Sequence, residues 1–120
     1  MSRYNTHGIF VAMWSVVDHP DAEGEYRKLG AREAVAVDNA TAKLKELGPK
    51  LGFPHSSAVK GTDKLRELRP RGGRSVTRPL YRRIDDVFVI GTYAPEAESD
   101  PKGFTRACRA AERRLDEIED

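Results

Sequence analysis

The sequence is poor in the residues that build cross-linked or metal-bound folds. It contains one cysteine, Cys108, and three histidines among 120 residues. A single cysteine excludes a disulfide within the chain and is typical of a protein from a reducing compartment. The cysteine, histidines and carboxylates show no spacing typical of a zinc site, which needs four ligands. We therefore expect a cytoplasmic protein that uses neither a metal nor another cofactor.

Long apolar runs are also absent. No stretch of about 18 apolar residues occurs, so we expect no membrane-spanning helix and no membrane partner. The apolar segment Ile9–Val17 is too short for a signal peptide and is followed by the polar turn Asp18-His19-Pro20. A hydrophobic content of 38% suffices for a small two-layer core. This predicts one domain over residues 9–120 after a flexible polar tail over residues 1–8.

The pattern of apolar residues predicts an α+β fold in the order β-α-α-β-β-β-α, with an antiparallel sheet packed against helices. The expected strands are Ile9–Val17, Lys64–Arg69, Arg74–Ile84 and Val87–Tyr93, with a loop over Lys50–Gly61. The expected helices are a short one capped by Asp18, a second over Ala31–Leu47, and a last one from Pro101 with an apolar stripe from Phe104 to Ile118. Pro79 indicates that its strand is an edge strand or carries a β-bulge.

Charge is unevenly distributed along the chain. The basic segment Lys60–Arg83 holds nine basic and two acidic side chains, a net charge of +7. The other 96 residues hold 12 basic and 17 acidic side chains, a net charge of −5. A local excess of positive charge on predicted strands is typical of a surface that binds phosphate groups. The basic segment therefore predicts a nucleic-acid partner.

Two short motifs lie inside the basic segment. Leu65–Arg69 reads Leu-Arg-Glu-Leu-Arg and Arg78–Tyr81 reads Arg-Pro-Leu-Tyr, with a glycine turn at Gly72-Gly73 between them. Together with the preceding loop, which runs from Leu47-Gly48 through Pro54-His55 to Val59-Lys60-Gly61, these motifs resemble the HigB-like, phage-derived branch of the RelE/ParE toxin superfamily. The resemblance covers most of the chain, from Leu44 to Ile118, and implies a RelE-like fold.

The resemblance implies the toxin of a type II toxin–antitoxin system. Members of the RelE and HigB groups cleave mRNA in the ribosomal A site without a metal, by transferring a 2′-hydroxyl onto the adjacent phosphate. The implied partners are mRNA, the ribosome and a cognate antitoxin, which we expect to be a helix-turn-helix protein encoded by a neighbouring gene. Such a reaction needs cations for the phosphate charge and groups that move protons.

Arg69 and Arg78 match the two family arginines expected at the scissile phosphate, and Lys60 resembles a lysine for RNA contact or proton transfer. Glu67 shares a strand face with Arg69, so it could be the base or the side chain that holds the arginine. The side chains that we expect to bind RNA are His55, Arg66, Arg71, Arg74, Tyr81, Arg82 and Arg83.

The chain departs from the family pattern after the last predicted strand. RelE-type nucleases commonly carry lysines there, whereas Tyr93–Asp100 is acidic. Either Tyr93 or Glu96 takes over acid–base chemistry, or the protein binds without cutting, like ParE-like relatives that inhibit gyrase. A nucleic-acid-binding module unrelated to toxins is a third alternative. The sequence leaves these alternatives open.

Overall fold

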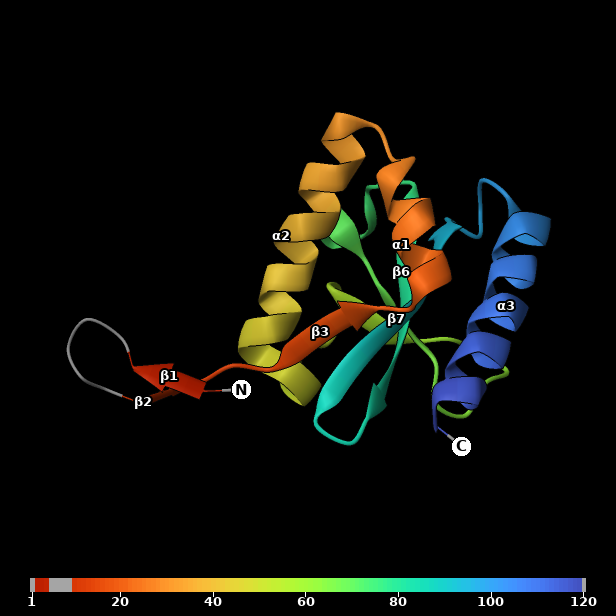
Figure 1. The fold of residues 1–120 in the computed structure, drawn as a ribbon. Coiled ribbons are helices and arrows are strands. Elements are labelled where there is room, and N and C mark those ends of the chain that lie inside the picture. Colours follow the sequence, from red (N-terminus) through yellow and green to blue (C-terminus); the bar gives the residue numbers. More distant parts are fainter. Residues whose placement is uncertain (1, 5–9, 120) are drawn as a thin grey trace.

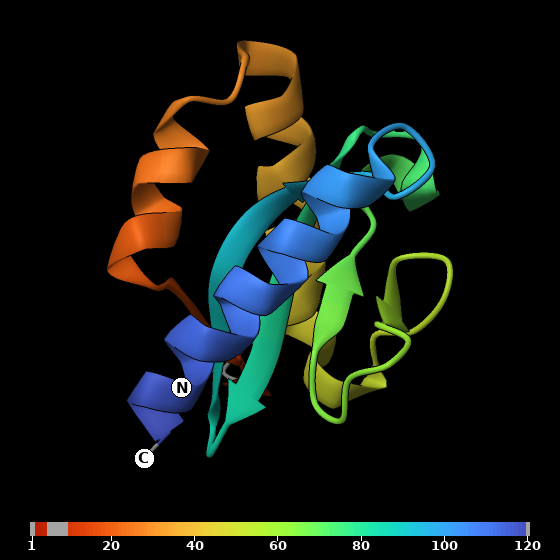
Figure 2. The same ribbon diagram turned by 90° about the vertical axis from the view of Figure 1, so that its right-hand side faces the viewer.

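The computed structural model describes residues 2–4 and 10–119. They form a five-stranded sheet in the order β3-β7-β6-β5-β4, with two helices on one face and one on the other (Figures 1 and 2). The strands of this sheet are β3 (Ser15–Asp18), β4 (Ser56–Ala58), β5 (Arg66–Leu68), β6 (Thr77–Ile84) and β7 (Val87–Pro95). The helices are α1 (Pro20–Arg27), α2 (Ala31–Leu47) and α3 (Pro101–Glu119), with short 3-10 turns η1 (Gly48–Lys50) and η2 (Pro70–Gly73). The α+β class predicted from the sequence is confirmed.

The predicted first strand is divided in two. Phe10–Ala12 forms β2, which pairs antiparallel with β1 (Ser2–Tyr4), while Ser15–Asp18 forms β3 of the main sheet. The chain leaves the first pairing at Trp14, whose N–H donates to the carbonyl of Lys45 in α2 at 2.8 Å. Of the predicted flexible tail, residues 1 and 5–8 lie outside the described residues.

The sheet is mixed, in contrast to the predicted antiparallel sheet. β3 runs parallel to β7, and the other three neighbouring pairs are antiparallel. Parallel pairing requires a long connection between the two strands, and here β3 and β7 are separated by α1, α2 and the three other strands of the sheet. Sequence alternation within one strand carries no information about the direction of its partner.

Helix α1 begins one residue later in the chain than a cap at Asp18 predicts. Asp18 is the last residue of β3, and His19 is the N-cap, with Nδ1 accepting a hydrogen bond from the backbone N–H of Asp21 at 3.0 Å. Pro20 occupies the first turn, where a missing N–H is tolerated. Helix α2 has the predicted bounds. No helix within residues 2–4 and 10–119 has the length and apolar character needed to cross a membrane.

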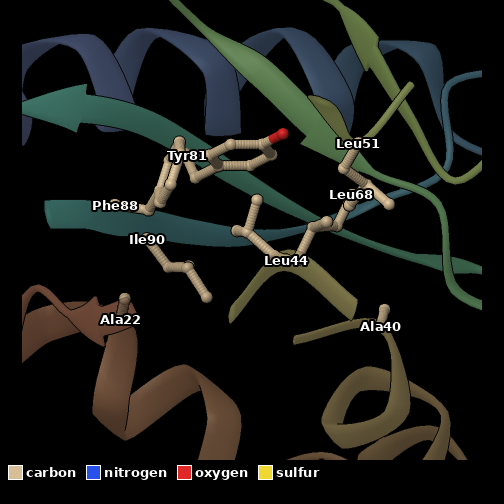
Figure 3. Packing of buried hydrophobic residues seen from close by; sticks show 8 residues of the cluster. All are labelled: Ala22, Ala40, Leu44, Leu51, Leu68, Tyr81, Phe88 and Ile90. Carbon is tan, nitrogen blue, oxygen red and sulfur yellow. The ribbon is translucent and has the colours of Figure 1, made fainter. Parts of the chain in front are cut away.

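One hydrophobic cluster fills the space between the sheet and helices α1 and α2 (Figure 3). Its buried members are Ala22, Ala40, Leu44, Leu51, Leu68, Tyr81, Phe88 and Ile90. Trp14 packs edge-on against Phe88 at a centroid distance of 5.5 Å, and Tyr81 packs similarly at 5.7 Å. Helix α2 contributes Ala40 and Leu44 to this cluster, four residues apart on one side of the helix.

A second cluster lies under α3 on the opposite face of the sheet. Cys108, Ala111 and Leu115 of the predicted helical stripe are buried there against Leu80 and Val89. Gly91 allows the close approach, because a Cβ at this position would lie 3.1 Å from Cα of Ala111. Burial raises the pKa of the Cys108 thiol to about 11, which suppresses the thiolate. Cys108 is therefore a core residue, as the stripe predicts.

The middle of the sheet shows two differences from expectation. Ser56–Ala58 of the predicted loop is strand β4, paired with β5; its Ser-Ser-Ala sequence carries no apolar alternation. Pro79 lies in the interior strand β6, so the predicted edge position is wrong. A β-bulge is present close to Pro79, but its extra residue lies in the neighbouring strand β7. The register changes from Leu80↔Thr92 to Tyr81↔Ile90, which leaves Gly91 of β7 without a partner in the β6 ladder.

Candidate functional site

A cleft of about 460 Å³ opens on the α3 face, where β4 and β5 meet η2 and the loop between β7 and α3. Figure 2 shows this loop beside η2, and the N–H of Glu96 donates to the carbonyl of Val76 at 2.8 Å. The cleft is lined by Ser57, Ala58, Val59, Lys60, Glu67, Arg69, Gly73, Arg78, Glu96, Ala97, Glu98 and Phe104. Four of the five predicted catalytic residues, Lys60, Glu67, Arg69 and Arg78, thus line one cleft.

Glu67 joins the two arginines of the cleft. Its Oε1 accepts a hydrogen bond from Nη1 of Arg69 at 3.1 Å and lies 3.3 Å from Nε of Arg78. The Glu67 side chain is only 13% exposed, so solvent screens these ion pairs weakly. Of the two roles considered for Glu67, this geometry supports holding the arginines.

Arg78 is 4% exposed and supports the turn beside the cleft. Its Nη2 donates to the carbonyl of Gly73 at 2.9 Å, and its Nη1 donates to the carbonyl of Ser75. These bonds use the planar fork of a guanidinium, which lysine lacks. Arg78 therefore lines the cleft with a side chain that is already engaged with backbone and carboxylate.

Arg69 is the more accessible of the two arginines. Its Nε donates to the carbonyl of Pro54 at 3.1 Å, and its guanidinium lies 5.0 Å from the ring centroid of Phe53. Gly73 provides the room for this side chain, because a Cβ there would lie 2.5 Å from Nη2 of Arg69. Since Gly73 also has a φ of +98°, its place in the turn strongly favours glycine.

Lys60 reaches the cleft from an ordered turn after β4. The turn is closed by hydrogen bonds from N–H of Val59 to the carbonyl of Leu65 at 3.0 Å and from Oγ1 of Thr62 to the carbonyl of Val59 at 2.8 Å. Lys60 itself is exposed. A mobile ammonium at the rim can meet a phosphate or a leaving oxygen.

The acidic loop forms the remaining wall. The Glu96 carboxylate accepts from Oγ of Ser99 at 2.6 Å and from N–H of Glu98 at 2.5 Å. These two bonds, with a smaller contribution from the positive charge of Arg78, hold the pKa of Glu96 below its usual range. Three acidic side chains, Glu67, Glu96 and Glu98, therefore share the cleft with three basic ones.

Tyr93 does not reach the cleft. Its hydroxyl donates to Oδ1 of Asp18 at 2.8 Å, and its ring packs against Tyr26 on the α1 side of the sheet. Burial, followed by the hydrogen bond to Asp18, raises the pKa of Tyr93. The reason for this placement is the bulge at Gly91, which shifts the alternation of β7 by one residue. The expected acid–base role of Tyr93 does not fit this position.

Two of the predicted RNA-binding residues are buried. Tyr81 is 1% exposed in the core (Figure 3). Its hydroxyl shares a 2.6 Å hydrogen bond with Oγ of Ser56. Arg82 is 4% exposed and donates to Asp116 at 2.7 Å and Glu119 at 3.0 Å, which ties β6 to α3. Neither side chain is available to line an RNA path, because the fold uses both.

Other predicted RNA-binding residues lie at different places around the sheet. Arg66 is half-buried and donates from Nε to Oγ of Ser56 at 3.1 Å. Arg83 is exposed at the far end of β6, where its guanidinium lies 4.8 Å from the ring of Trp14. Arg74 is exposed and follows Gly73 in the chain, but it does not line the cleft. The basic side chains of this segment are therefore divided among several separate places in the folded structure.

His55 and Arg71, the remaining two, line a second hollow of about 210 Å³, the α2 groove. It lies between α2 and η2 and is lined by Arg32, Val35, Ala36, Asn39, Ala40, Lys43, His55, Arg69 and Arg71. None of the α2 residues was singled out from the sequence. The available signal was the spacing of Arg32, Asn39 and Lys43, which places them on one side of a helix.

Comparison with known proteins supports the fold. No protein-family model matches the chain, and no curated protein matches it. A solved structure of a mutant of the E. coli toxin RelE in the free state is similar, with a TM-score of 0.63 and 19% identity over 86% of this chain and 98% of that one. An archaeal RelE–RelB complex from Pyrococcus horikoshii OT3 matches with a TM-score of 0.49 and 21% identity over 69% of this chain and 94% of that one. The likeness to the E. coli structure shows that the chain has a RelE-like fold.

Proposed function

We propose that the protein is the toxin of a type II toxin–antitoxin system and cleaves mRNA on the ribosome. The observation that carries the proposal is the cleft, in which Lys60, Arg69 and Arg78 converge around Glu67 on a RelE-like fold. We further propose that it belongs to the HigB-like branch, acts in the cytoplasm, and is neutralised by an antitoxin encoded next to it.

The proposed reaction is a metal-free transfer within the RNA chain. The 2′-oxygen bonds to the adjacent phosphorus while the bond from phosphorus to the 5′-oxygen breaks, which leaves a 2′,3′-cyclic phosphate and a 5′-hydroxyl. The Glu96 carboxylate, which lines the cleft, takes the proton of the 2′-hydroxyl, and the departing 5′-oxygen gains a proton from Lys60. Negative charge builds on the non-bridging phosphate oxygens, where a positioned guanidinium lowers the barrier.

Each cleft residue has a role in this proposal. Arg69 binds the scissile phosphate, because it is the more accessible of the two arginines. Glu67 and Arg78 position Arg69 and the η2 turn through the contacts at 3.1 and 3.3 Å and the bonds to the turn carbonyls. Lys60, at the rim of the cleft, is the group proposed to move the proton to the leaving oxygen.

A second candidate function is binding without cleavage, as a ParE-like or inactive RelE-fold protein. The balance of charges in the cleft favours this alternative. Glu67 already pairs with both arginines, and Glu96 and Glu98 add two negative charges to the lining of the cleft. Such a protein would bind a ribosome, a topoisomerase or its antitoxin alone.

Induced expression of the wild type and of Arg69→Ala in a bacterial host, with growth and primer extension on translated mRNA as readouts, tests the proposal. We expect growth arrest and new 5′ ends with the wild type and loss of both with Arg69→Ala. Arg83→Ala, at the far end of β6, is the matched control and should behave as the wild type. Growth arrest without new 5′ ends would favour the binding alternative, and cleavage by Arg69→Ala would refute the assignment of Arg69.

A further inference from the structure

The α2 groove and the cleft differ sharply in charge. Of the described residues that line the α2 groove, four are permanently basic and none is acidic. The cleft is lined by three basic and three acidic side chains. Two of the four basic side chains of the groove have a carboxylate beside them: Oε1 of Glu67 lies 3.1 Å from Nη1 of Arg69, and Oε2 of Glu33 lies 3.9 Å from Nη1 of Arg71. With Arg32 and Lys43 in addition, the lining of the groove carries an excess of positive charge, whereas the charges that line the cleft balance.

The shape of the groove suits an extended anion. Arg32 and Lys43 lie eleven residues apart on α2, which separates them by about 16 Å along the helix axis. Arg69 lines both the α2 groove and the cleft, so the two hollows meet at one guanidinium. A chain that carries a negative charge at each repeat could contact the groove and the cleft at the same time.

An aromatic ring lies beside Arg69, the residue that lines both hollows. Phe53 is 76% exposed, although burying its ring would be favourable. The guanidinium of Arg69 lies 5.0 Å from the ring centroid, and His55, two residues later, lines the groove. Sites for single-stranded nucleic acid combine these two features, a basic groove that follows the backbone and an exposed aromatic side chain on which a base stacks.

We propose that the α2 groove binds the backbone of single-stranded RNA next to the cleft, and that Phe53 stacks against one of its bases. This inference rests on the proposed function and extends it, because it places the RNA outside the cleft on residues of α2. Arg32, Lys43 and Arg71 contact phosphates, and Arg69 links this bound segment to the scissile phosphate. An acidic protein segment is the competing occupant, but it gives no reason for an exposed aromatic ring beside the cations.

Fluorescence anisotropy with a short, labelled oligouridylate that carries 2′-O-methyl groups tests the groove. The methyl groups block the proposed attack of the 2′-oxygen, so binding is measured without cleavage. Arg32→Glu/Lys43→Glu should weaken binding at least tenfold. The variant should also make the slope of log K against log salt less negative by about 1.4, because each lost phosphate contact with a single strand reduces its magnitude by about 0.7. The control is Arg109→Glu/Arg113→Glu, which makes the same change of charge at exposed sites of α3 on the opposite face and should leave affinity within twofold of the wild type.

A second pair of variants tests Phe53. Phe53→Ala should lose about fivefold in affinity or more, because stacking of one base contributes about 1–3 kcal/mol. Phe53→Trp should retain the affinity, since it offers a larger aromatic face. Equal affinity of Phe53→Ala and the wild type would exclude stacking at this position.

The same measurements separate this inference from the proposed function. Groove-dependent RNA binding without cleavage on ribosomes would remove the nuclease proposal and keep the groove. Cleavage by a protein whose RNA binding is unaffected by Arg32→Glu/Lys43→Glu, or a wild type that does not bind the oligouridylate, would overturn the groove as an RNA site. Loss of antitoxin binding alone in that variant would also overturn it, in favour of an acidic protein segment.

Discussion

Nη2 of Arg78 donates a 2.9 Å hydrogen bond to the carbonyl oxygen of Gly73, so a side chain of β6 holds the η2 turn that precedes this strand. The same guanidinium contacts Glu67 on the neighbouring strand. Strand, turn and carboxylate therefore form one unit around Arg69. Changes in this unit should alter the fold and the cleft together.

Replacing Arg78 tests this unit most directly. Arg78→Lys keeps a positive charge but loses the fork that bonds the carbonyls of Gly73 and Ser75, so we expect a loss of about 2–4 kcal/mol in the free energy of unfolding. Urea denaturation measures it. Lys60→Arg, an exchange in the opposite direction at an exposed site of the same cleft, should change stability by less than about 0.5 kcal/mol. Wild-type stability of Arg78→Lys would show that the bonds to the turn contribute nothing.

Two adjacent glycines of η2 provide a matched comparison. Gly72→Ala meets only the strain of a positive φ of 64°, because nothing lies near its Cβ position, and should destabilise by about 1–2 kcal/mol. Gly73→Ala adds a collision with the Arg69 guanidinium and should destabilise more and reduce RNA binding. Thermal unfolding and oligouridylate binding measure both effects. If both variants lost the same stability and affinity, the contact between Gly73 and Arg69 would be unimportant.

Arg82 and Arg83 are neighbours with different surroundings. Arg82→Ala removes a buried side chain that bonds Asp116 and Glu119, and we expect a loss of about 1–3 kcal/mol in stability, reduced by the solvent exposure of both carboxylates. Arg83→Ala removes an exposed contact with Trp14 and should cost about 0.5–1 kcal/mol. Urea denaturation distinguishes them. A larger effect of Arg83→Ala on stability would contradict the placement of Arg82.

The partly buried hydroxyl of Tyr93 should make the free energy of unfolding depend on pH in alkaline solution. Its pKa in the folded protein is raised by burial and by Asp18, so the stability that it contributes is present below its ordinary pKa of about 10 and is lost as the pH rises through the higher folded value. Stability measured from pH 8 upward should therefore fall less steeply in Tyr93→Phe than in the wild type. Parallel pH profiles would rule out this linkage. Growth arrest by Tyr93→Phe should match the wild type, because Tyr93 lies outside the cleft.

The sequence predicts the features that depend on local spacing within one helix or one strand. The apolar stripe of α3 and the bounds of α2 follow from helical spacing, and the pairing of Glu67 with Arg69 follows from a shared strand face. The other features depend on partners distant in the chain. Ser56–Ala58 becomes a strand only beside β5, and Arg82 is buried only because α3 brings acidic side chains to it.

The same distinction applies to the candidate site. The excess charge of the basic segment is visible in the sequence, but its division among the cleft, the α3 contact and the α2 groove is not. Arg32 and Lys43 lie outside the segment and join it through the packing of α2 against η2. Tyr93 belongs to the predicted strand Val87–Tyr93, whose sequence does not show that β7 carries an extra, unpaired residue at Gly91.

Gly91, the unpaired residue of the β-bulge, reverses the alternation of side chains between the two halves of β7. Before it, Phe88 and Ile90 face α1 and α2; after it, Tyr93 faces the same side although its number is odd. The face on which Tyr93 lies is thus set by the bulge as well as by the identity of the residues. If β7 kept all its residues but ran without the bulge, Tyr93 would face α3 and lose its hydrogen bond to Asp18, so one unpaired glycine joins the end of the strand to the α1 side of the sheet.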